Sequence, residues 1–266
     1  FGFAMWMAAV CFAQTPCERL KSLSLPNTTI TAAESVAAGP YRAPGQADGA
    51  PAMLPAHCRV AALLTPSSDS HIEMEIWLPT ENWNGEFQAV GNGGWAGTIS
   101  FTYRASAVER SLVAALREGY ATASTDTGHK AAEAPEASFA LGHPEKLIDF
   151  AYRAVHEMTV QSKAIIAAFY GRAPRLSYWN GCSTGGRQGL MAAQRYPEDF
   201  DAVLVGAPAN YQTHLDAWDM HRSLTNQKDQ DHLVPPAKLN LLNRAVLAAC
   251  DALDGVRDGL LTDPQK

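Results

Sequence analysis

The sequence has 266 residues, of which 47% are hydrophobic and 18% charged, enough to bury the core of one large domain or of a domain with an insertion. Its formal charge is −6 and it contains no run of Lys and Arg, which argues against a basic groove for nucleic acid. The five cysteines occur in no CxxC or Cys/His pattern, so the common zinc sites are excluded.

The first residues, 1–13, are apolar and end in small residues before the polar Gln14. This run is too short to span a bilayer and is typical of a secretory signal peptide. It has no basic start and no Met at position 1, so we expect the sequence to begin inside that leader. A buried N-terminal helix is the alternative. No other apolar stretch is long enough for a membrane, and we expect a secreted or periplasmic protein that has no membrane partner after signal removal.

The remaining cysteines suit an oxidising compartment, because removal of the leader removes Cys11 and leaves an even number. Cysteine counting alone does not give their pairing.

Residues 14–58 follow the leader. They are rich in Ala, Pro, Gly and Thr and lack a helical period, so we expect an irregular segment. Residues 71–78 alternate, which predicts a half-buried strand with one apolar face, formed by Ile72, Met74, Ile76 and Leu78. A short strand, 87–90, then leads into the glycine-rich loop 91–97.

Strands and helices alternate over the following residues, which predicts a mainly parallel sheet with helices on its faces. The expected elements are a helix at 106–118 that includes Val108 and stops at Gly119, a strand at 120–125, the loop 126–129, a long helix at 145–170 stopped by Gly171, a strand at 176–179, a helix at 186–195 and a strand at 201–205. After Gly206 the alternation of strands and helices ends. Residues 211–249 carry two helical stretches, the second at 236–249, which we interpret as the start of an inserted cap.

The strongest motif is Gly181-Cys182-Ser183-Thr184-Gly185, which matches the G-x-S-x-G nucleophile elbow of α/β-hydrolases. The predicted strand before it, helix after it and further strand beyond make this context specific. Such a tight turn exposes the serine hydroxyl above a helix N-terminus, where the amide after the serine can donate to an oxyanion. A glycine-rich turn that merely connects the two elements is the alternative.

A second oxyanion amide is expected from the loop after an earlier strand, and Gly91-Asn92-Gly93-Gly94 occupies that place. Its glycines allow the backbone to approach a reacting carbon closely. A plain turn is the alternative interpretation of this loop.

Several motifs together resemble the tannase and feruloyl esterase family, which also contains bacterial mono(2-hydroxyethyl) terephthalate hydrolases. They are Gly-Cys-Ser-Thr-Gly-Gly-Arg at 181–187, Leu-Pro-Ala-His-Cys at 54–58, Trp-Asn-Gly at 83–85, Gly-Asn-Gly-Gly-Trp at 91–95 and Cys-Asp-Ala-Leu-Asp-Gly-Val-Arg-Asp-Gly at 250–259. The resemblance runs from about Cys17 to Pro264.

The resemblance implies that Ser183 is the nucleophile and that the backbone amides of Thr184 and Gly94 are the oxyanion donors. It implies a Cys17–Cys58 disulfide. It also implies that Cys182 pairs with a cysteine beside the catalytic His and that Cys250 pairs with a cysteine downstream, both beyond Lys266.

The resemblance further implies a structural Ca²⁺ site, with side-chain ligands from aspartates and main-chain carbonyls from two apolar residues: Asp251, Asp254, Val256, Asp258 and Leu260. Three aspartates spaced around glycines offer the hard oxygen donors that calcium prefers, although the EF-hand spacing and its final Glu are missing. From the residues alone a solvated Asp/Gly turn is the simpler interpretation; the resemblance favours calcium.

The fold class that follows is α/β, an α/β-hydrolase fold with the start of an inserted cap domain and with its C-terminal part absent from this sequence. We expect a signal-peptide remnant at 1–13, the N-terminal part of the core at 14–210, and the start of the cap with its calcium loop at 211–266. The chain order of the triad is Ser, acid, His, so we expect the catalytic Asp and His after Lys266.

The histidines of this sequence are not expected to be the catalytic base. His214, His221 and His232 fall in the cap-like helices and are interpreted as surface or packing residues. His129 precedes the serine; it is a candidate for lining the site.

The expected function is a secreted serine carboxylic ester hydrolase that acts on small aromatic acyl esters through an acyl-enzyme. A non-catalytic, calcium-stabilised secreted module of the same fold is the alternative, and a serine peptidase or acyltransferase would use the same elbow. An Asp and then a His beside a Cys in the downstream sequence would favour the esterase over the non-catalytic module. Substrate turnover assays would separate the esterase from a peptidase or an acyltransferase.

Overall fold

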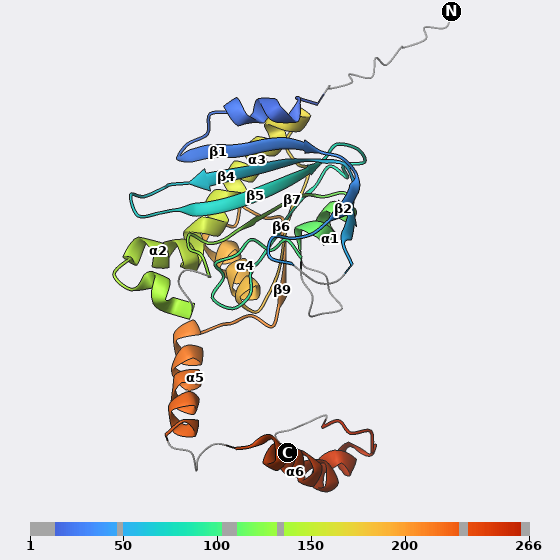
Figure 1. The fold of residues 1–266 in the computed structure, drawn as a ribbon, viewed down its shortest axis with the longest axis vertical. Helices are drawn as coiled ribbons and strands as arrows, with labels where there is room; N and C mark the ends of the chain where they lie inside the picture. Colours follow the sequence, from blue (N-terminus) through green and yellow to red (C-terminus); the bar gives the residue numbers. More distant parts are fainter. Residues whose placement is uncertain (1–13, 47–49, 103–110, 132–135, 229–233, 262–266) are drawn as a thin grey trace, which may run out of the picture. The chain divides into compact units, whose positions relative to one another are not determined.

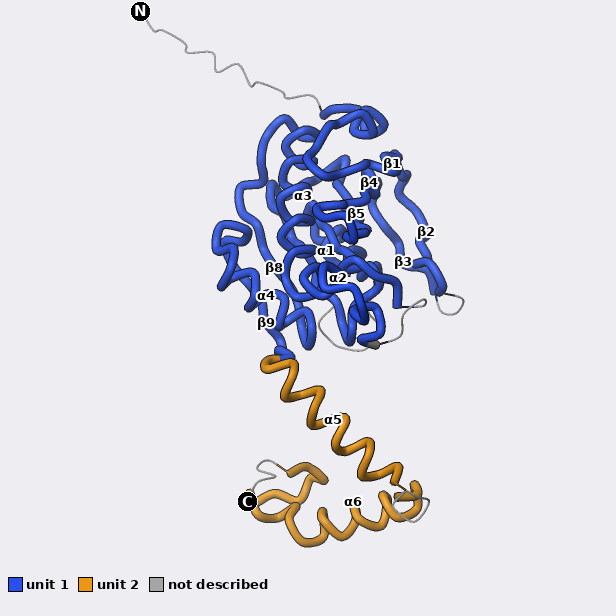
Figure 2. The backbone as a smooth tube through the Cα atoms, turned by 90° about the vertical axis from the view of Figure 1, so that its left-hand side faces the viewer, with its two compact units in different colours: residues 1–209 blue, residues 210–266 orange. Residues whose placement is uncertain are grey.

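The computed structural model describes residues 14–46, 50–102, 111–131, 136–228 and 234–261 (Figure 1). The chain divides into two compact units, Phe1–Ala209 and Asn210–Lys266, which Figure 2 colours separately. The expected signal remnant at 1–13 lies outside the described residues, as does the part of the predicted 106–118 helix that contains Val108.

A mixed sheet forms the centre of the first unit. Within the described residues it has seven strands in the order β1 (Thr28–Val36), β4 (His57–Leu64), β5 (Ile72–Pro79), β7 (Ala121–Thr125), β6 (Phe87–Val90), β8 (Ser177–Cys182) and β9 (Ala202–Gly206). The pairs from β1 to β7 are antiparallel, whereas β7, β6, β8 and β9 run parallel. The prediction of a mainly parallel sheet was therefore wrong for the first half, where the short β4–β5 connection allows a hairpin.

Helices cover both faces of this sheet. One face packs against α3 (Ala154–Tyr170), whose Met158 and Ile165 belong to the same buried cluster as the apolar face of β5 that the sequence predicted. The other face packs against α1 (Leu112–Arg117), where Leu112 and Leu116 surround Trp77. Because both faces are covered, β5 is buried almost throughout, rather than half-buried as predicted.

The segment before β4 is more regular than its composition predicts. It contains a 3₁₀ helix η1 (Cys17–Ser22), the nine-residue strand β1, and a separate hairpin of β2 (Gly39–Tyr41) and β3 (Ala52–Leu54). The prediction of an irregular segment was wrong. In β1 small Ala and Thr side chains weaken the alternation, and a register shift between Ile30 and Ala32 interrupts it.

A long helical segment was predicted at 145–170 and is confirmed with one interruption. It consists of α2 (Pro144–Ile148), a π-helical turn η3 (Asp149–Arg153) and α3, and it ends at Gly171 in the left-handed conformation with φ of 70°. A 3₁₀ helix, η2 (Glu136–Ala140), precedes it.

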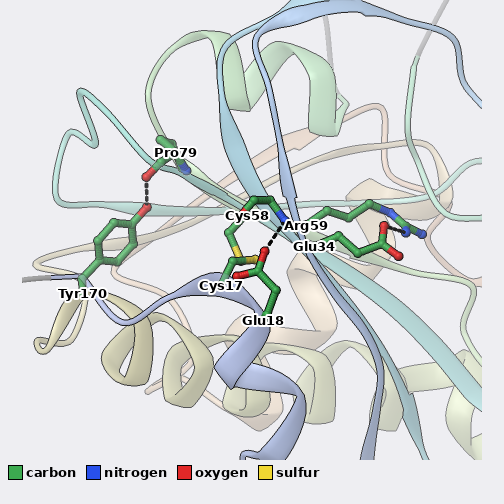
Figure 3. Close-up of a disulfide and its surroundings, with 8 residues drawn as sticks. Cys17, Glu18, Glu34, Cys58, Arg59, Pro79 and Tyr170 are labelled. Atoms are coloured by element: carbon green, nitrogen blue, oxygen red, sulfur yellow. Dashed lines mark hydrogen bonds and ion pairs between the residues drawn. A yellow bond between two sulfur atoms is a disulfide. The ribbon is translucent and has the colours of Figure 1, made fainter.

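The disulfide between Cys17 and Cys58 joins η1 to β4, as the resemblance implied (Figure 3). Both cysteines are buried. Close by, the Tyr170 hydroxyl donates to the Pro79 carbonyl at 2.7 Å, which attaches the end of α3 to the end of β5. The N-terminal segment is thus fixed covalently to the sheet.

The second unit contains α5 (Gln212–Asn226), α6 (Pro236–Cys250) and a 3₁₀ turn η5 (Asp251–Asp254). The two helices agree with the stretches predicted at 211–249. No residue of either helix is buried. Among the residues that the structure describes, no helix combines the length and the apolar character that a membrane span requires.

Candidate active site

Ser183 lies at a sharp turn between β8 and α4 (Thr184–Arg195), with φ of 58° and ψ of −121°. A positive φ is costly for any residue with a Cβ and persists only where the surroundings fix it. Here the Ser183 amide donates to Gly206 at 2.9 Å, while its carbonyl accepts from Arg187 at 3.1 Å and Ala209 at 3.0 Å. Ser183 itself is exposed, so the turn presents its hydroxyl to solvent.

The glycines of the motif are required by close backbone contacts. A Cβ at Gly185 would lie 2.9 Å from the Asn92 carbonyl oxygen, and a Cβ at Gly181 would overlap the carbonyl of Gly185. A Cβ at Gly91 would lie 2.7 Å from the Gly185 Cα. These separations are shorter than a Cβ permits, so the glycine-rich loop 91–97 and the first turn of α4 touch through their backbones.

Two hydrogen bonds hold this loop beside the elbow. The Gly185 amide donates to the Asn92 carbonyl at 2.8 Å, and Thr184 Oγ1 donates to the Gly94 carbonyl. The structure therefore brings Gly94 beside Ser183 and Thr184, although 90 positions separate Gly94 from Thr184 in the sequence. Since α4 begins at Thr184, the amide of that residue has no acceptor within the helix and is available to a ligand.

A buried amide pair beneath this contact was missed by the sequence analysis. The Asn92 backbone N–H donates to Gln188 Oε1 at 3.1 Å, and the Gln188 side-chain Nε2 donates back to Asn92 Oδ1 at 2.9 Å. Asn92 Nδ2 also donates to Thr125 in β7 at 2.8 Å. The sequence signal was a polar residue two positions after the end of β6, and it did not reveal the partner.

His129 contacts the same loop at Trp95. Its Nε2 lies 2.8 Å from the Trp95 carbonyl oxygen, and its ring stacks on Phe139 with 3.7 Å between centroids. Because a carbonyl only accepts, Nε2 carries the proton. Burial lowers the pKa of His129, which favours the neutral ring. The Nε2–H group of His129 thus binds loop 91–97.

A polar depression of about 710 Å³ lies beside His129 and includes Asp126 and Lys130. Burial raises the pKa of Asp126 to about 6, although its Oδ2 lies 3.3 Å from Lys130 Nζ and its Oδ1 accepts two backbone amides. Asp126 and Lys130 thus form an ion pair at this depression.

The model of the family described as "Tannase and feruloyl esterase" matches residues 58–266. The chain belongs to this family.

Individual relatives of the chain are also named esterases. An uncharacterized esterase of Xanthomonas campestris pv. campestris is 41% identical over 262 residues, covering 96% of this chain and 42% of the relative. A probable feruloyl esterase B-1 of Aspergillus terreus is 38% identical over 247 residues, covering 91% and 44%. The chain thus spans less than half the length of these curated relatives.

Solved structures show the same α/β fold. Feruloyl esterase B from Aspergillus oryzae superposes with a TM-score of 0.80 at 34% identity, covering 93% of this chain and 48% of that one. Tannin acyl hydrolase from Aspergillus niger superposes with a TM-score of 0.66 at 26% identity, covering 94% and 44%.

The calcium ligands implied by the tannase and feruloyl esterase family lie in and after η5. Each aspartate accepts one amide of its own loop: Asp251 from Gly259 at 2.9 Å, Asp254 from Val256 at 2.9 Å and Asp258 from Leu260 at 3.0 Å. These oxygens are chemically suited to calcium. Within the described residues, however, no three acidic, His or Cys side chains gather closely enough to hold a metal ion.

Two other cysteines and two histidines that the sequence analysis considered also lie within the described residues. Cys182 and Cys250 are free thiols, partly exposed. His214 and His221 lie exposed on α5, as predicted for surface residues, and His232 lies outside the described residues.

Proposed function

We propose that this protein is a secreted serine carboxylic ester hydrolase that acts on small aromatic acyl esters. The observation that carries the proposal is the exposed Ser183, held at a positive φ at the N-terminus of α4 beside the tethered Gly94. The aromatic acyl class is supported by the relatives named feruloyl esterase and tannin acyl hydrolase.

The proposed reaction is acyl transfer in two steps. Ser183 Oγ attacks the ester carbonyl carbon, and the carbonyl oxygen becomes an oxyanion that accepts from the amides of Thr184 and Gly94. Collapse expels the alcohol and leaves a serine ester, which water then attacks to release the acid. Within the described residues no histidine bonds to Ser183 Oγ, and we propose that the acid and base follow in the chain order of the fold.

Secretion is supported by the buried Cys17–Cys58 disulfide, since disulfides persist in oxidising compartments. We also propose that the loop at Asp251, Asp254 and Asp258 takes up a structural calcium ion through a rearrangement that gathers the carboxylates. Its support is the donor chemistry and the family resemblance.

The test of function uses the protein produced from its complete gene and recovered from the extracytoplasmic fraction. Ser183→Ala is expected to lower kcat for an activated aromatic ester by about 10³-fold or more, because only the oxyanion donors and binding remain. Its melting temperature should change little. Near-normal turnover by Ser183→Ala, or no turnover by the unmodified protein, would reject the esterase; the latter would favour the non-catalytic module. Hydrolysis of amides in preference to esters would favour a peptidase.

A further inference from the structure

The turn at residues 93–96 carries the proposed Gly94 donor, and the carbonyls of its first three residues all accept hydrogen bonds. The Gly93 carbonyl accepts from the Ala96 amide at 3.0 Å, which closes the turn. The Gly94 carbonyl accepts from Thr184 Oγ1, and the Trp95 carbonyl accepts from His129 Nε2 at 2.8 Å. Gly94 adopts φ of 55° and its backbone is exposed.

These bonds determine where the Gly94 amide points. In a trans peptide the C=O of one residue and the N–H of the next point in opposite directions. The His129 bond to the Trp95 carbonyl therefore orients the Ala96 N–H away from His129, toward the Gly93 carbonyl that it binds. Because the Gly93 carbonyl points toward the Ala96 N–H, inside the turn, the Gly94 N–H of the same peptide points away from the turn.

His129 is itself fixed firmly enough to act in this way. It is 6% exposed, stacks on Phe139 and stands edge-on to Phe150 at 6.1 Å between centroids. Phe150 also packs against the Trp95 ring at 5.7 Å, so the carbonyl and the side chain of Trp95 are held by one aromatic cluster. The neutral ring expected from burial has a single N–H, and the Trp95 carbonyl takes it.

We propose that His129 is a positioning residue of the esterase: through the Trp95–Ala96 peptide plane and the Gly93–Gly94 plane hydrogen-bonded to it, His129 holds the Gly94 N–H in the direction an oxyanion needs. This inference rests on the proposed function. It predicts that the hydrogen-bond donor at the Nε2 position matters, and that basicity at that position does not.

The experiment compares three variants of the protein produced from its complete gene. Gln places a side-chain N–H donor at the position of His129 Nε2. Met has a similar length but no donor, and the Asn side chain is too short to bring its donor to the Trp95 carbonyl. His129→Met and His129→Asn are expected to lower kcat at least about tenfold with KM changed less than about twofold, a fraction of the 10²–10³-fold cost of losing an oxyanion donor. His129→Gln should stay within about threefold of the unmodified protein.

A second readout is the rate at which an aryl phosphonate labels Ser183, since the tetrahedral adduct uses the same donors. It should fall in parallel with kcat in His129→Met and His129→Asn and be restored in His129→Gln, at temperatures below every variant's melting midpoint. Unchanged kcat in His129→Met or His129→Asn would overturn the proposal. Equal losses in His129→Gln and His129→Asn would also overturn it, because they would indicate a base. If Ser183→Ala retained turnover, the proposed function would fail instead.

Discussion

At the level of single residues, the parts of the site that could be predicted are those with local constraints. Ser183 and its flanking glycines were predictable because the strand-to-helix turn demands small neighbours within a few positions. The Asn92–Gln188 pair was not, since its partners are 96 residues apart and neither belongs to a local pattern. His129 was recognised as a candidate for lining the site, but its acceptor, Trp95, was not predictable from the sequence.

A pH prediction follows from His156, whose Nδ1 lies 2.9 Å from Oδ2 of the buried Asp199. This hydrogen bond, opposed by partial burial, raises the pKa of His156 above its ordinary 6.5. The folded state therefore holds the proton more tightly, so the stabilisation is complete below about pH 6.5 and disappears as pH rises through the folded-state pKa.

The measurement is the free energy of unfolding of the unmodified protein minus that of His156→Gln, from denaturant titrations across this range. The difference should be about 1–2 kcal/mol near pH 5.5 and shrink toward pH 9. Asp199→Asn is the matched control and should show the same trend. A difference that grows with pH would contradict the assignment.

At the level of elements, hydrophobic periodicity and glycine positions predicted β5, β6, the α-helices α3 to α6 and the left-handed helix end at Gly171, but not the 3₁₀ helix η2. The π-helical turn η3 was not predictable. In the structure Arg187 of α4 donates to the carbonyls of Ala151 at 3.1 Å and Phe150 at 3.4 Å. A widened turn alters the pairing of helix carbonyls, and an arginine from a distant helix compensates. Such a tertiary partner leaves no periodic signal in the sequence.

The loop after α6 gives the prediction at this scale. A ligand that binds only the native state raises stability by mass action, by about 2.7 kcal/mol at a hundredfold excess over Kd, and we propose calcium as that ligand. Chelation of the protein produced from its complete gene should therefore lower its melting temperature. Asp254→Ala should remove the response to calcium, whereas Asp219→Ala on α5 should keep it. A calcium-free preparation whose melting temperature ignores added calcium would leave the loop an ordinary turn.

At the level of the whole molecule, the sequence predicted an α/β architecture followed by a change to helices, but not the mixed sheet. Pairing direction depends on which strands become neighbours, and the order β5-β7-β6-β8 is not the chain order. Strand β9 ends the sheet within the described residues, and Leu204 on it is 58% exposed. An edge strand with an open hydrogen-bonding side is a template for pairing with another chain.

We therefore expect residues 14–266, produced alone, to self-associate. The measurement is molar mass by light scattering over a concentration series. Leu204→Lys should reduce association, because a charge on an edge strand opposes pairing, while Leu141→Lys, on an exposed position away from β9, should not. A monomer at all concentrations, or equal association in both variants, would contradict this expectation.

The backbone contact between Gly91 and Gly185 also matters for protein engineering. The Trp179 indole donates to the Gly185 carbonyl at 2.8 Å, and a Cβ at Gly91, Gly181 or Gly189 would come within 3.0 Å of its ring. A Cβ at Gly185 would come equally close to the Asn92 carbonyl. A saturation library that randomises these codons would consist almost entirely of misfolded clones. Screening effort is better spent on the exposed rim, such as Gly93, where a Cβ would meet nothing within 4 Å.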